Sequence, residues 1–558
     1  MTALDDFFTH YYARRPVNAT FTGVHAYDDQ LPDWSPDGLA AMDDEMASLG
    51  AALGSEFPVP ASPATFRNSP DLLDAELARG FLEVQRAEHA SLHGPRGNPA
   101  LWSGEAVFSI VSLMIREFAS DEERAELASA RCGRLGEFLS GPQRPVPRPW
   151  VERAVRDCDG GSILLRDGFP RWLAALDLPA ERRAELERSA AAAVATLSEF
   201  SSRMSVHPEA PESAMSCGPD MYDLLLARGH CCTRARGDLL ADARERFAAA
   251  RAELDSLARN VAGSIDDALA ALAAIHPTPD EYLSTFESIW GECHALAERA
   301  NVIAWPEWPI RYVPFPEWTA DAAPHLYYLY YRSPSALDPY TMYDYVVPPL
   351  PIDPAAAERH LRVWNTSTIK LNHVVHHGAI GHHVQNWYAY HQQRSRFGAV
   401  AAVDCANRIG MFAGGTMAEG WACYATDLME ELGFLTPLEQ VSQQHSRVRM
   451  LARAIVDIEL HQGSMTLTDA IRFYTDQIGM GTAAARSEAV KNSMFPCTAI
   501  MYWLGTQGIH DLRAEFERRE GARFSLRRFH GALLGAGSVP VPLVSRMLTA
   551  PPSGKAGQ

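Results

Sequence analysis

The segment DLLDAELARGFLEVQRAEHASL (71–92) places apolar residues at intervals of three and four, the spacing that gathers them on one face of an α-helix. Segments 180–203 and 237–275 show the same spacing and are rich in Ala, Leu, Glu and Arg, which favour helices. Proline-bearing stretches punctuate these helical segments; they lie at 141–150, 206–220 and 274–282. The sequence therefore predicts a mainly α protein.

Strand-forming residues are concentrated in the middle of the chain. IRYVPFPEW (310–318) and HLYYLYYRS (325–333) are rich in aromatic and β-branched residues, which predicts a small sheet or hairpin near 310–350. The proline-rich YDYVVPPLPIDP (343–354) is predicted as a loop that leads into another helical region.

The length of the chain bears on its organisation. With 558 residues it exceeds the size at which one compact core stops growing, so we expect two or more lobes. We predict an N-terminal helical lobe over residues 1–300 and a second lobe over residues 301–550 that carries the unusual polar residues and hence the chemistry. The last residues, 551–558, are predicted to form a disordered tail.

The charge and the N-terminus narrow the class of protein. A formal net charge of −19 argues against nucleic acid and anionic membranes as main partners, because both require a basic surface. The first 16 residues lack the basic start and apolar run of a signal peptide, and no later segment is apolar enough to span a bilayer. Nine cysteines, an odd number, fit a reducing compartment. We therefore expect a cytoplasmic protein that acts on a small-molecule or peptide partner.

Five of the twenty histidines lie within KLNHVVHHGAIGHHVQNW (370–387). On a straight helix His373 and His377 lie on one face, one turn apart, a geometry that can hold a metal ion. The alternative interpretation is a surface or interface patch of histidines. The density of imidazoles, which includes two His-His pairs, favours metal binding.

A second pair of histidines in this stretch needs a bend in order to meet. His376 and His382 are six residues apart and would diverge on a straight helix. Gly378 and Gly381 lie between them and permit a bulge or kink, a common device at functional sites.

Another helix is predicted in MAEGWACYATDLMEELGF (417–434), where large apolar residues recur at helical spacing. Glu419 lies in its first turn beside Gly420, which leaves room for the close approach of another element. A carboxylate at this position can act as a third metal ligand from a separate helix. It can equally be an acidic residue that complements a helix N-terminus.

A third polar pattern follows one helix face in RVRMLARAIVDIELH (447–461). Such a ladder can orient a ligand histidine or hold a substrate carboxylate through an arginine. It can also be a solvated helix face, where pairs at this spacing contribute little. The residues, spaced four apart, are Arg449, Arg453, Asp457 and His461.

Several segments together resemble the bacterial family known as domain of unknown function 885, whose members look like relatives of helical zinc metallopeptidases. HHGAIGHHVQ (376–385) is similar to the family's H-E-x-x-P-G-H-H-x-Q, and EGWACYA (419–425) to its E-G-W-A-x-Y. The resemblance extends along nearly the whole chain in the expected order, through segments 23–39, 453–461, 498–505 and 524–544. It implies a metallopeptidase-like helical fold with a deep central cleft.

The resemblance also implies a set of site residues. His376, His382 and Glu419 would bind a zinc ion and leave one position open for water, whose pKa zinc would lower to around 7. His383 would lie beside the metal as a donor or an alternative ligand, since spacing does not decide between it and His382. Tyr502 is similar to a family tyrosine and would donate a hydrogen bond to an oxyanion.

The chain departs from the family pattern at two positions. His377 stands where the family has the glutamate that acts as general base, and Ile380 stands where it has proline. A neutral imidazole at residue 377 can accept a proton, can become an additional ligand suited to other transition metals, or can mark the loss of peptidase chemistry.

The resulting hypothesis is a metal-dependent hydrolase, most simply with zinc, that acts on a peptide or another small amide. One alternative is a non-hydrolytic metalloenzyme with His377 in the ligand set. Another is a degenerate peptidase that binds a small ligand. The sequence gives neither the substrate nor the oligomeric state.

Overall fold

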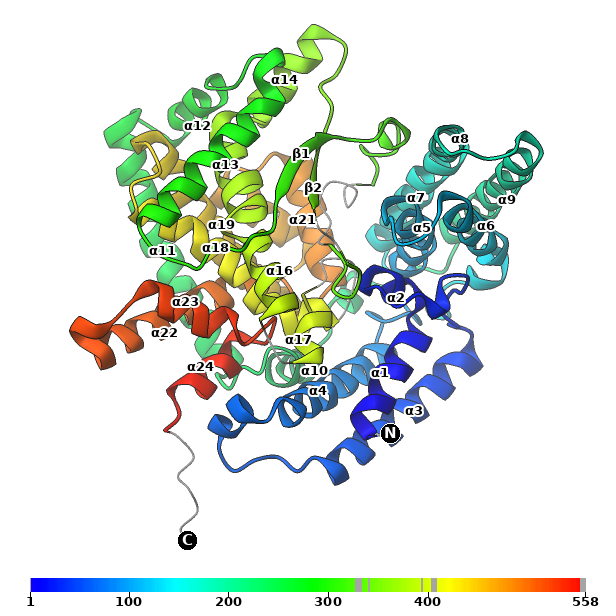
Figure 1. Cartoon of the computed structure of the whole chain (residues 1–558), viewed down its shortest axis with the longest axis horizontal. Coiled ribbons are helices and arrows are strands. Elements are labelled where there is room, and N and C mark those ends of the chain that lie inside the picture. The colour runs from blue at the N-terminus through cyan, green and yellow to red at the C-terminus, as the bar shows by residue number, and fades with distance from the viewer. Residues whose placement is uncertain (1, 327–333, 340–341, 393–394, 403–408, 552–558) are drawn as a thin grey trace.

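The computed structural model describes residues 2–326, 334–339, 342–392, 395–402 and 409–551. Over these residues the protein is mainly α, with two short strands near the middle of the chain, which confirms the predicted class (Figure 1). Among the helices described, none has the length and apolar character needed to cross a membrane.

The helices fall into an earlier and a later group along the chain. Those of the first group are α1 (Ala3–Arg14), α2 (Pro16–Thr22), α3 (Pro36–Glu56), α4 (Pro70–Ala90), α5 (Pro99–Ile115), α6 (Asp121–Phe138), α7 (Arg148–Ile163), α8 (Phe169–Ala175), α9 (Ala180–Ser205), α10 (Pro219–Leu224), α11 (Arg236–Val261), α12 (Ile265–Ala274) and α13 (Tyr282–Arg299). Those of the second are α14 (Pro354–Val363), α15 (Thr366–Thr368), the π-helix η9 (Ile369–Gly378), α16 (His382–His391), α17 (Arg396–Val400), α18 (Gly415–Glu431), α19 (Pro437–His461), α20 (Leu467–Ile478), α21 (Thr482–Met494), α22 (Met501–Glu520), α23 (Leu526–Leu534) and α24 (Val541–Thr549).

The periodic segments form helices close to where the apolar spacing predicts them. Segment 71–92 forms α4, and segment 180–203 forms α9. Segment 237–275 differs, because it forms two helices, α11 and α12. The chain turns between them at Gly263, whose φ of +96° favours glycine, and the side chain of Ser264 then caps α12.

The small sheet consists of β1 (Ile310–Pro314) and β2 (Tyr343–Val347), which pair in parallel with Ile310 opposite Tyr343. The sheet was predicted, but β2 lies where we expected only a loop. The first five residues of that segment alternate between buried and more exposed positions, as strand residues do, before the prolines begin. Most of the predicted strand at 325–333 lies outside the described residues.

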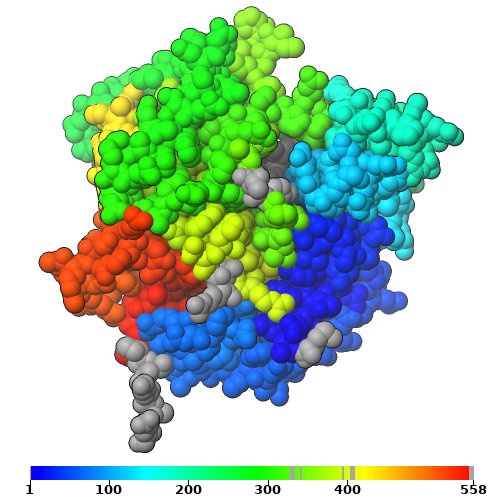
Figure 2. All heavy atoms as spheres, viewed as in Figure 1, coloured from blue at the N-terminus to red at the C-terminus, as the bar shows by residue number. Residues whose placement is uncertain are grey.

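Three hydrophobic clusters fill the interior, and each combines early and late parts of the chain. The first joins α1 and α4 to α13, η9 and α18; the second joins α5, α7 and α9 to α19, α20 and α21. The third joins α10 and α11 to α19 and α22. In the space-filling view, blue and cyan residues meet green and yellow ones along a broad seam (Figure 2). Each cluster contains residues from both 1–300 and 301–550. The clusters therefore do not separate the two expected lobes, and the division stays a prediction. Of the predicted tail, residues 552–558 lie outside the described part of the chain.

Candidate metal site

The histidine stretch folds as two helical pieces joined by a sharp break. The π-helix η9 ends at Gly378, and α16 begins at His382. The break is tight, because a Cβ atom at Gly381 would collide with the carbonyl oxygen of His376. The Gly381 backbone N–H donates to the carbonyl oxygen of Val375 at 2.9 Å. The ring centres of His376 and His382 consequently lie 4.8 Å apart, with the rings nearly perpendicular.

Helix α18 brings Glu419 to these two rings. Its Oε2 atom lies 3.3 Å from Nε2 of His376 and 3.7 Å from Nε2 of His382. The same oxygen is buried and has no well-oriented hydrogen-bond donor among the described residues. A buried carboxylate oxygen beside two imidazole nitrogens is a donor set suited to a divalent transition metal.

Close packing of α18 fixes the position of Glu419. A Cβ atom at Gly420 would lie 2.6 Å from Cα of Gly505, so α18 and α22 cross at a point where only glycine fits. On the other side, the Trp421 indole Nε1 donates to the carbonyl oxygen of Ile380 at 2.8 Å. The room that Gly420 was expected to leave for another element is therefore filled by α22.

The protonation states of these groups suit metal binding. Burial lowers the pKa of His376, although Glu419 partly opposes the shift. Burial would raise the pKa of Glu419, but the neighbouring imidazoles of His376 and His382 outweigh it and hold that pKa well below its usual range. A carboxylate and a neutral imidazole are the forms that bind metal ions.

His377 reaches the same place as the two expected ligand histidines. Its Nδ1 atom donates to the carbonyl oxygen of Asn372 at 2.6 Å, which leaves Nε2 as the proton-free nitrogen in the neutral ring. One nitrogen from each of His376, His377 and His382 lies within 4.8 Å of the others. Burial first, and then the neighbouring histidines, lower the pKa of His377 well below its usual range. The ring is thus a neutral base or ligand.

Two other histidines of the stretch do not join this group. His373 stacks on Trp364 with ring centres 3.9 Å apart, and its Nδ1 atom lies 2.8 Å from the Tyr345 hydroxyl. His383, expected beside the metal, instead places Nε2 at 2.8 Å from the carbonyl oxygen of Trp308 and stacks on that indole ring. His383 is therefore engaged with Trp308 and does not join the group that His382 belongs to.

Tyr502 and Glu419 line a common cavity of about 570 Å³. The cavity is lined by residues of α1, α4, α5, α7, α18, α21 and α22, among others. Burial raises the pKa of Tyr502 well above its usual range, so its hydroxyl keeps its proton at neutral pH. The Arg453 guanidinium lies 5.0 Å from the centre of the Tyr502 ring and pairs with Glu488 at 2.7 Å.

The rest of the polar ladder on α19 serves the fold. Asp457 is fully buried and accepts hydrogen bonds from the backbone N–H groups of Cys497 at 3.1 Å and Ile500 at 3.0 Å. His461 is also fully buried, and its Nε2 atom lies 2.9 Å from the carbonyl oxygen of Asn492. These two residues, expected to orient a ligand or bind substrate, instead hold the segment that leads into α22. Arg449, at the start of the ladder, is exposed.

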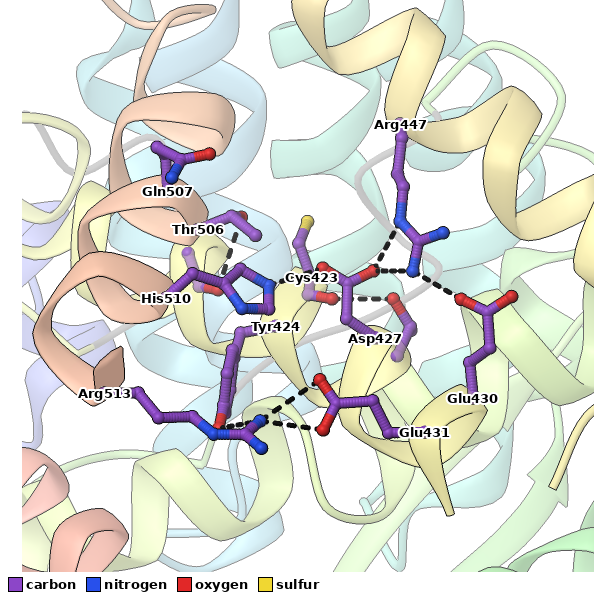
Figure 3. Close-up of polar contacts among 12 residues, drawn as sticks. Cys423, Tyr424, Asp427, Glu430, Glu431, Arg447, Thr506, Gln507, His510 and Arg513 are labelled. Atoms are coloured by element: carbon purple, nitrogen blue, oxygen red, sulfur yellow. Dashed lines mark hydrogen bonds and ion pairs between the residues drawn. The ribbon is translucent and has the colours of Figure 1, made fainter. Parts of the chain in front are cut away.

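A polar network at the C-terminal end of α18 holds this helix against α19 and α22 (Figure 3). Asp427 lies 2.9 Å from His510 of α22 and 2.7 Å from Arg447 of α19. Arg447 also pairs with Glu430, while Arg513 of α22 pairs with Glu431 at 2.8 Å. Figure 3 shows these groups pointing toward one another between the three helices. The network fixes the relative positions of the helices that carry Glu419, Arg453 and Tyr502.

Sequence reasoning missed the residues that hold the site together. Trp421 is one of the large apolar residues that predicted the helix in 417–434, but the need of its indole N–H for a nearby acceptor was not used. Lys491 and Arg156, which line the cavity, have no local pattern that distinguishes them from surface cations.

Comparison with known proteins places the chain in a family. Residues 16–548 match the family described as "Bacterial protein of unknown function (DUF885)". The protein belongs to the DUF885 family. Since the match covers nearly the whole chain, the resemblance seen in the motifs is confirmed at the level of the family.

Two solved structures have the same fold as this DUF885 protein. One is a "putative lipoprotein of unknown function from Shewanella oneidensis", with a TM-score of 0.75 and 18% identity. The other is a "putative lipoprotein from Colwellia psychrerythraea", with a TM-score of 0.77 and 17% identity. Each alignment covers 98% of this chain and 99% of the other. A comparison with curated proteins finds no match. At such low identity these likenesses show the fold alone.

Proposed function

We propose that this protein is a metal-dependent hydrolase, with zinc as its metal, that cleaves a peptide or another small amide. The observation that carries the proposal is the convergence of His376, His382 and Glu419, from three separate elements, with Glu419 also lining an internal cavity. Zinc held by such a set lowers the pKa of a bound water and polarises a carbonyl group. A cavity of about 570 Å³ lies within the range of small-ligand sites.

The chain's own residues supply the remaining functions of a hydrolase. His377 has its Nδ1 proton held by the carbonyl oxygen of Asn372, so Nε2 is available to accept a proton from the attacking water. Tyr502 retains its hydroxyl proton and can donate a hydrogen bond to the oxyanion that forms on the amide carbonyl. Its position in the cavity wall with Glu419 supports that role.

One observation favours a second candidate. A nitrogen of His377 lies in the same group of ligand atoms as those of His376 and His382. As a fourth protein ligand it would give a three-histidine, one-carboxylate set suited to metals other than zinc and to non-hydrolytic chemistry.

The experiment that tests the proposal measures hydrolysis of short peptides and small amides by zinc-loaded wild type, His377→Ala and His377→Glu. We expect His377→Ala to lose activity by about 100-fold or more while retaining zinc, because general-base catalysis is worth roughly 10²–10⁴. His377→Glu should restore part of the rate. If His377→Ala instead loses its metal, the second candidate is supported. Wild type that binds zinc but hydrolyses none of these compounds would contradict the proposal and favour a binding role.

A further inference from the structure

The cavity beside the candidate metal site has a wall rich in cations, and most of them are neutralised. Arg153 of α7 pairs with Asp157 at 3.0 Å. Arg486 of α21 pairs with Glu152 of α7 at 2.8 Å. The acidic partners in these two pairs, Asp157 and Glu152, also line the cavity, as does Glu419 of the candidate metal site.

Two cations in the same wall lack such a partner. The side chains of Lys491, on α21, and Arg156, on α7, both line the cavity and form no ion pair or hydrogen bond with a described residue. The two helices pack together, and the Trp150 indole Nε1 donates to the Ser493 hydroxyl across their contact at 2.9 Å. Arg156 is exposed and Lys491 is half-buried; in a protein with a net charge of −19, two such cations in one cavity wall are a specific feature of that wall.

Lys491 is linked to the candidate metal site through a series of neighbouring side chains. It is one helical turn after Glu488, which pairs with Arg453 at 2.7 Å. Arg453 in turn lies over the ring of Tyr502, and Tyr502 lines the cavity with Glu419. Lys491, Tyr502 and Glu419 therefore line one cavity that a ligand can occupy.

The other carboxyl groups of the wall lie beside different cations. Glu105, on α5, is influenced by Arg15 and Arg131, and its burial raises its pKa to about 7. Glu88, on α4, accepts a hydrogen bond from Gln85, to which Arg15 also donates. Asp157 and Glu488 interact electrostatically with Arg156 and Lys491, but neither forms an ion pair with them, so both cations can bind a ligand carboxylate.

We propose that Lys491 and Arg156 form a subsite for a carboxylate of the substrate. The inference rests on the proposed function and narrows it to short peptides or N-acyl amino acids that carry a negative charge beside the amide to be cleaved. Arginine and lysine bind carboxylates through charge-assisted hydrogen bonds, which are stronger where the cation is partly shielded from water, as the half-buried Lys491 is. The carboxylate is either the C-terminus or an acidic side chain.

The test uses three probes that share the same N-benzoylglycyl group: N-benzoylglycyl-alanine, its C-terminal amide, and N-benzoylglycyl-aspartate 1-amide. Calorimetry measures their affinity for the full-length protein after removal of metal, so binding is read independently of catalysis. We expect at least one carboxylate probe to bind about 10- to 100-fold more tightly than the uncharged amide. Tighter binding of N-benzoylglycyl-alanine would indicate that the subsite takes a C-terminal carboxylate. Tighter binding of N-benzoylglycyl-aspartate 1-amide would indicate that it takes a side-chain carboxylate.

The variants Lys491→Met and Arg156→Met should lose this preference, and Lys491→Arg should retain it. Arg188→Met removes an exposed cation of α9 with no ion-pair partner among the described residues and serves as the control. Equal affinity for acids and amide, weak binding of all three, or a preference unchanged in both Met variants would overturn the subsite.

Hydrolysis by zinc-loaded protein is measured separately with the same probes. Hydrolysis without a carboxylate preference leaves the proposed function standing and overturns the subsite. A preference that depends on Lys491 without any hydrolysis supports the subsite and counts against the proposed function.

Discussion

The indole Nε1 atom of Trp421 donates a hydrogen bond to the carbonyl oxygen of Ile380 at 2.8 Å and lies 3.2 Å from that of Gly381. Trp421 is two residues after Glu419, and Ile380 and Gly381 immediately precede His382. This single side chain therefore links the helix that carries the candidate carboxylate ligand to the break that orients the candidate histidine ligands.

We predict that Trp421→Phe weakens zinc binding by about 10-fold, because groups that orient metal ligands contribute roughly 10- to 100-fold to affinity. The variant keeps an aromatic ring in the core but removes the N–H donor. Competition with a chromogenic chelator measures the affinity. Trp387→Phe, a change in a half-buried ring of α16, is the matched control. An affinity for zinc equal to that of wild type would show that the bond does not position the ligands.

The break between η9 and α16 depends on the absence of a side chain at residue 381. In Gly381→Ala the new Cβ atom would collide with the carbonyl oxygen of His376, a backbone atom that cannot move aside cheaply. We expect the free energy of unfolding to fall by about 1–3 kcal/mol, as overpacked cores do, with loss of metal binding. Urea unfolding checks this. Gly50→Ala, in the open middle of α3, should instead stabilise by about 0.5–1 kcal/mol. Equal stability of the two variants would contradict the expectation.

Tyr502→Phe tests the oxyanion donor without disturbing the ligands. We predict that kcat falls by about 100-fold, the effect of removing one such donor, while zinc content stays that of wild type. Steady-state kinetics on the best hydrolysed amide and elemental analysis of the same sample provide both readings. An unchanged kcat would remove Tyr502 from the proposed mechanism, and loss of zinc would give it a structural role instead.

His25, which is far along the chain from the candidate metal site, makes a pH-dependent contribution to stability. His25 lies between Asp28, at 2.7 Å, and Asp338, at 2.9 Å. Burial alone would lower the pKa of His25, but hydrogen bonds and charge from the two carboxylates raise it to about 9. Because the folded pKa is above the unfolded value of about 6.5, the stabilisation is complete below pH 6.5 and is lost as pH rises through about 9.

The comparison of wild type with His25→Gln checks this assignment. The difference in their free energies of unfolding should be largest near pH 6 and should shrink steadily between pH 7 and pH 10. A difference that is constant over this range, or that grows with pH, would show that His25 is not protonated in the folded protein.

The fold could be predicted from the sequence where local patterns decide structure. Apolar spacing predicted α4 and α9, but the strand β2 was missed because prolines immediately after Val347 made the whole segment resemble a loop. The bend between His376 and His382 followed from two glycines. The orientation of His383, whose ring points away from the site, could not be predicted in this way, because the direction of each ring depends on where α16 begins.

The ligand set could be proposed only with the help of the family motif, since Glu419 alone is indistinguishable from a residue that complements a helix N-terminus. The cavity was beyond prediction. Its wall brings together Arg156, Lys491 and Tyr502, which lie on three different helices and have no pattern in common. Asp457 and His461 carry the same spacing as Arg453, yet only tertiary packing decides that they contact backbone groups while Arg453 contacts Glu488 and Tyr502.

Elemental analysis of purified wild type, His376→Ala, Glu419→Ala and His391→Ala tests the central claim most directly. His391 is exposed at the end of α16 and controls for the general loss of an imidazole. The proposed site predicts about one zinc per chain in wild type and His391→Ala, and none in the other two variants. Absence of metal from wild type even after reconstitution, or equal metal content in all four proteins, would contradict it.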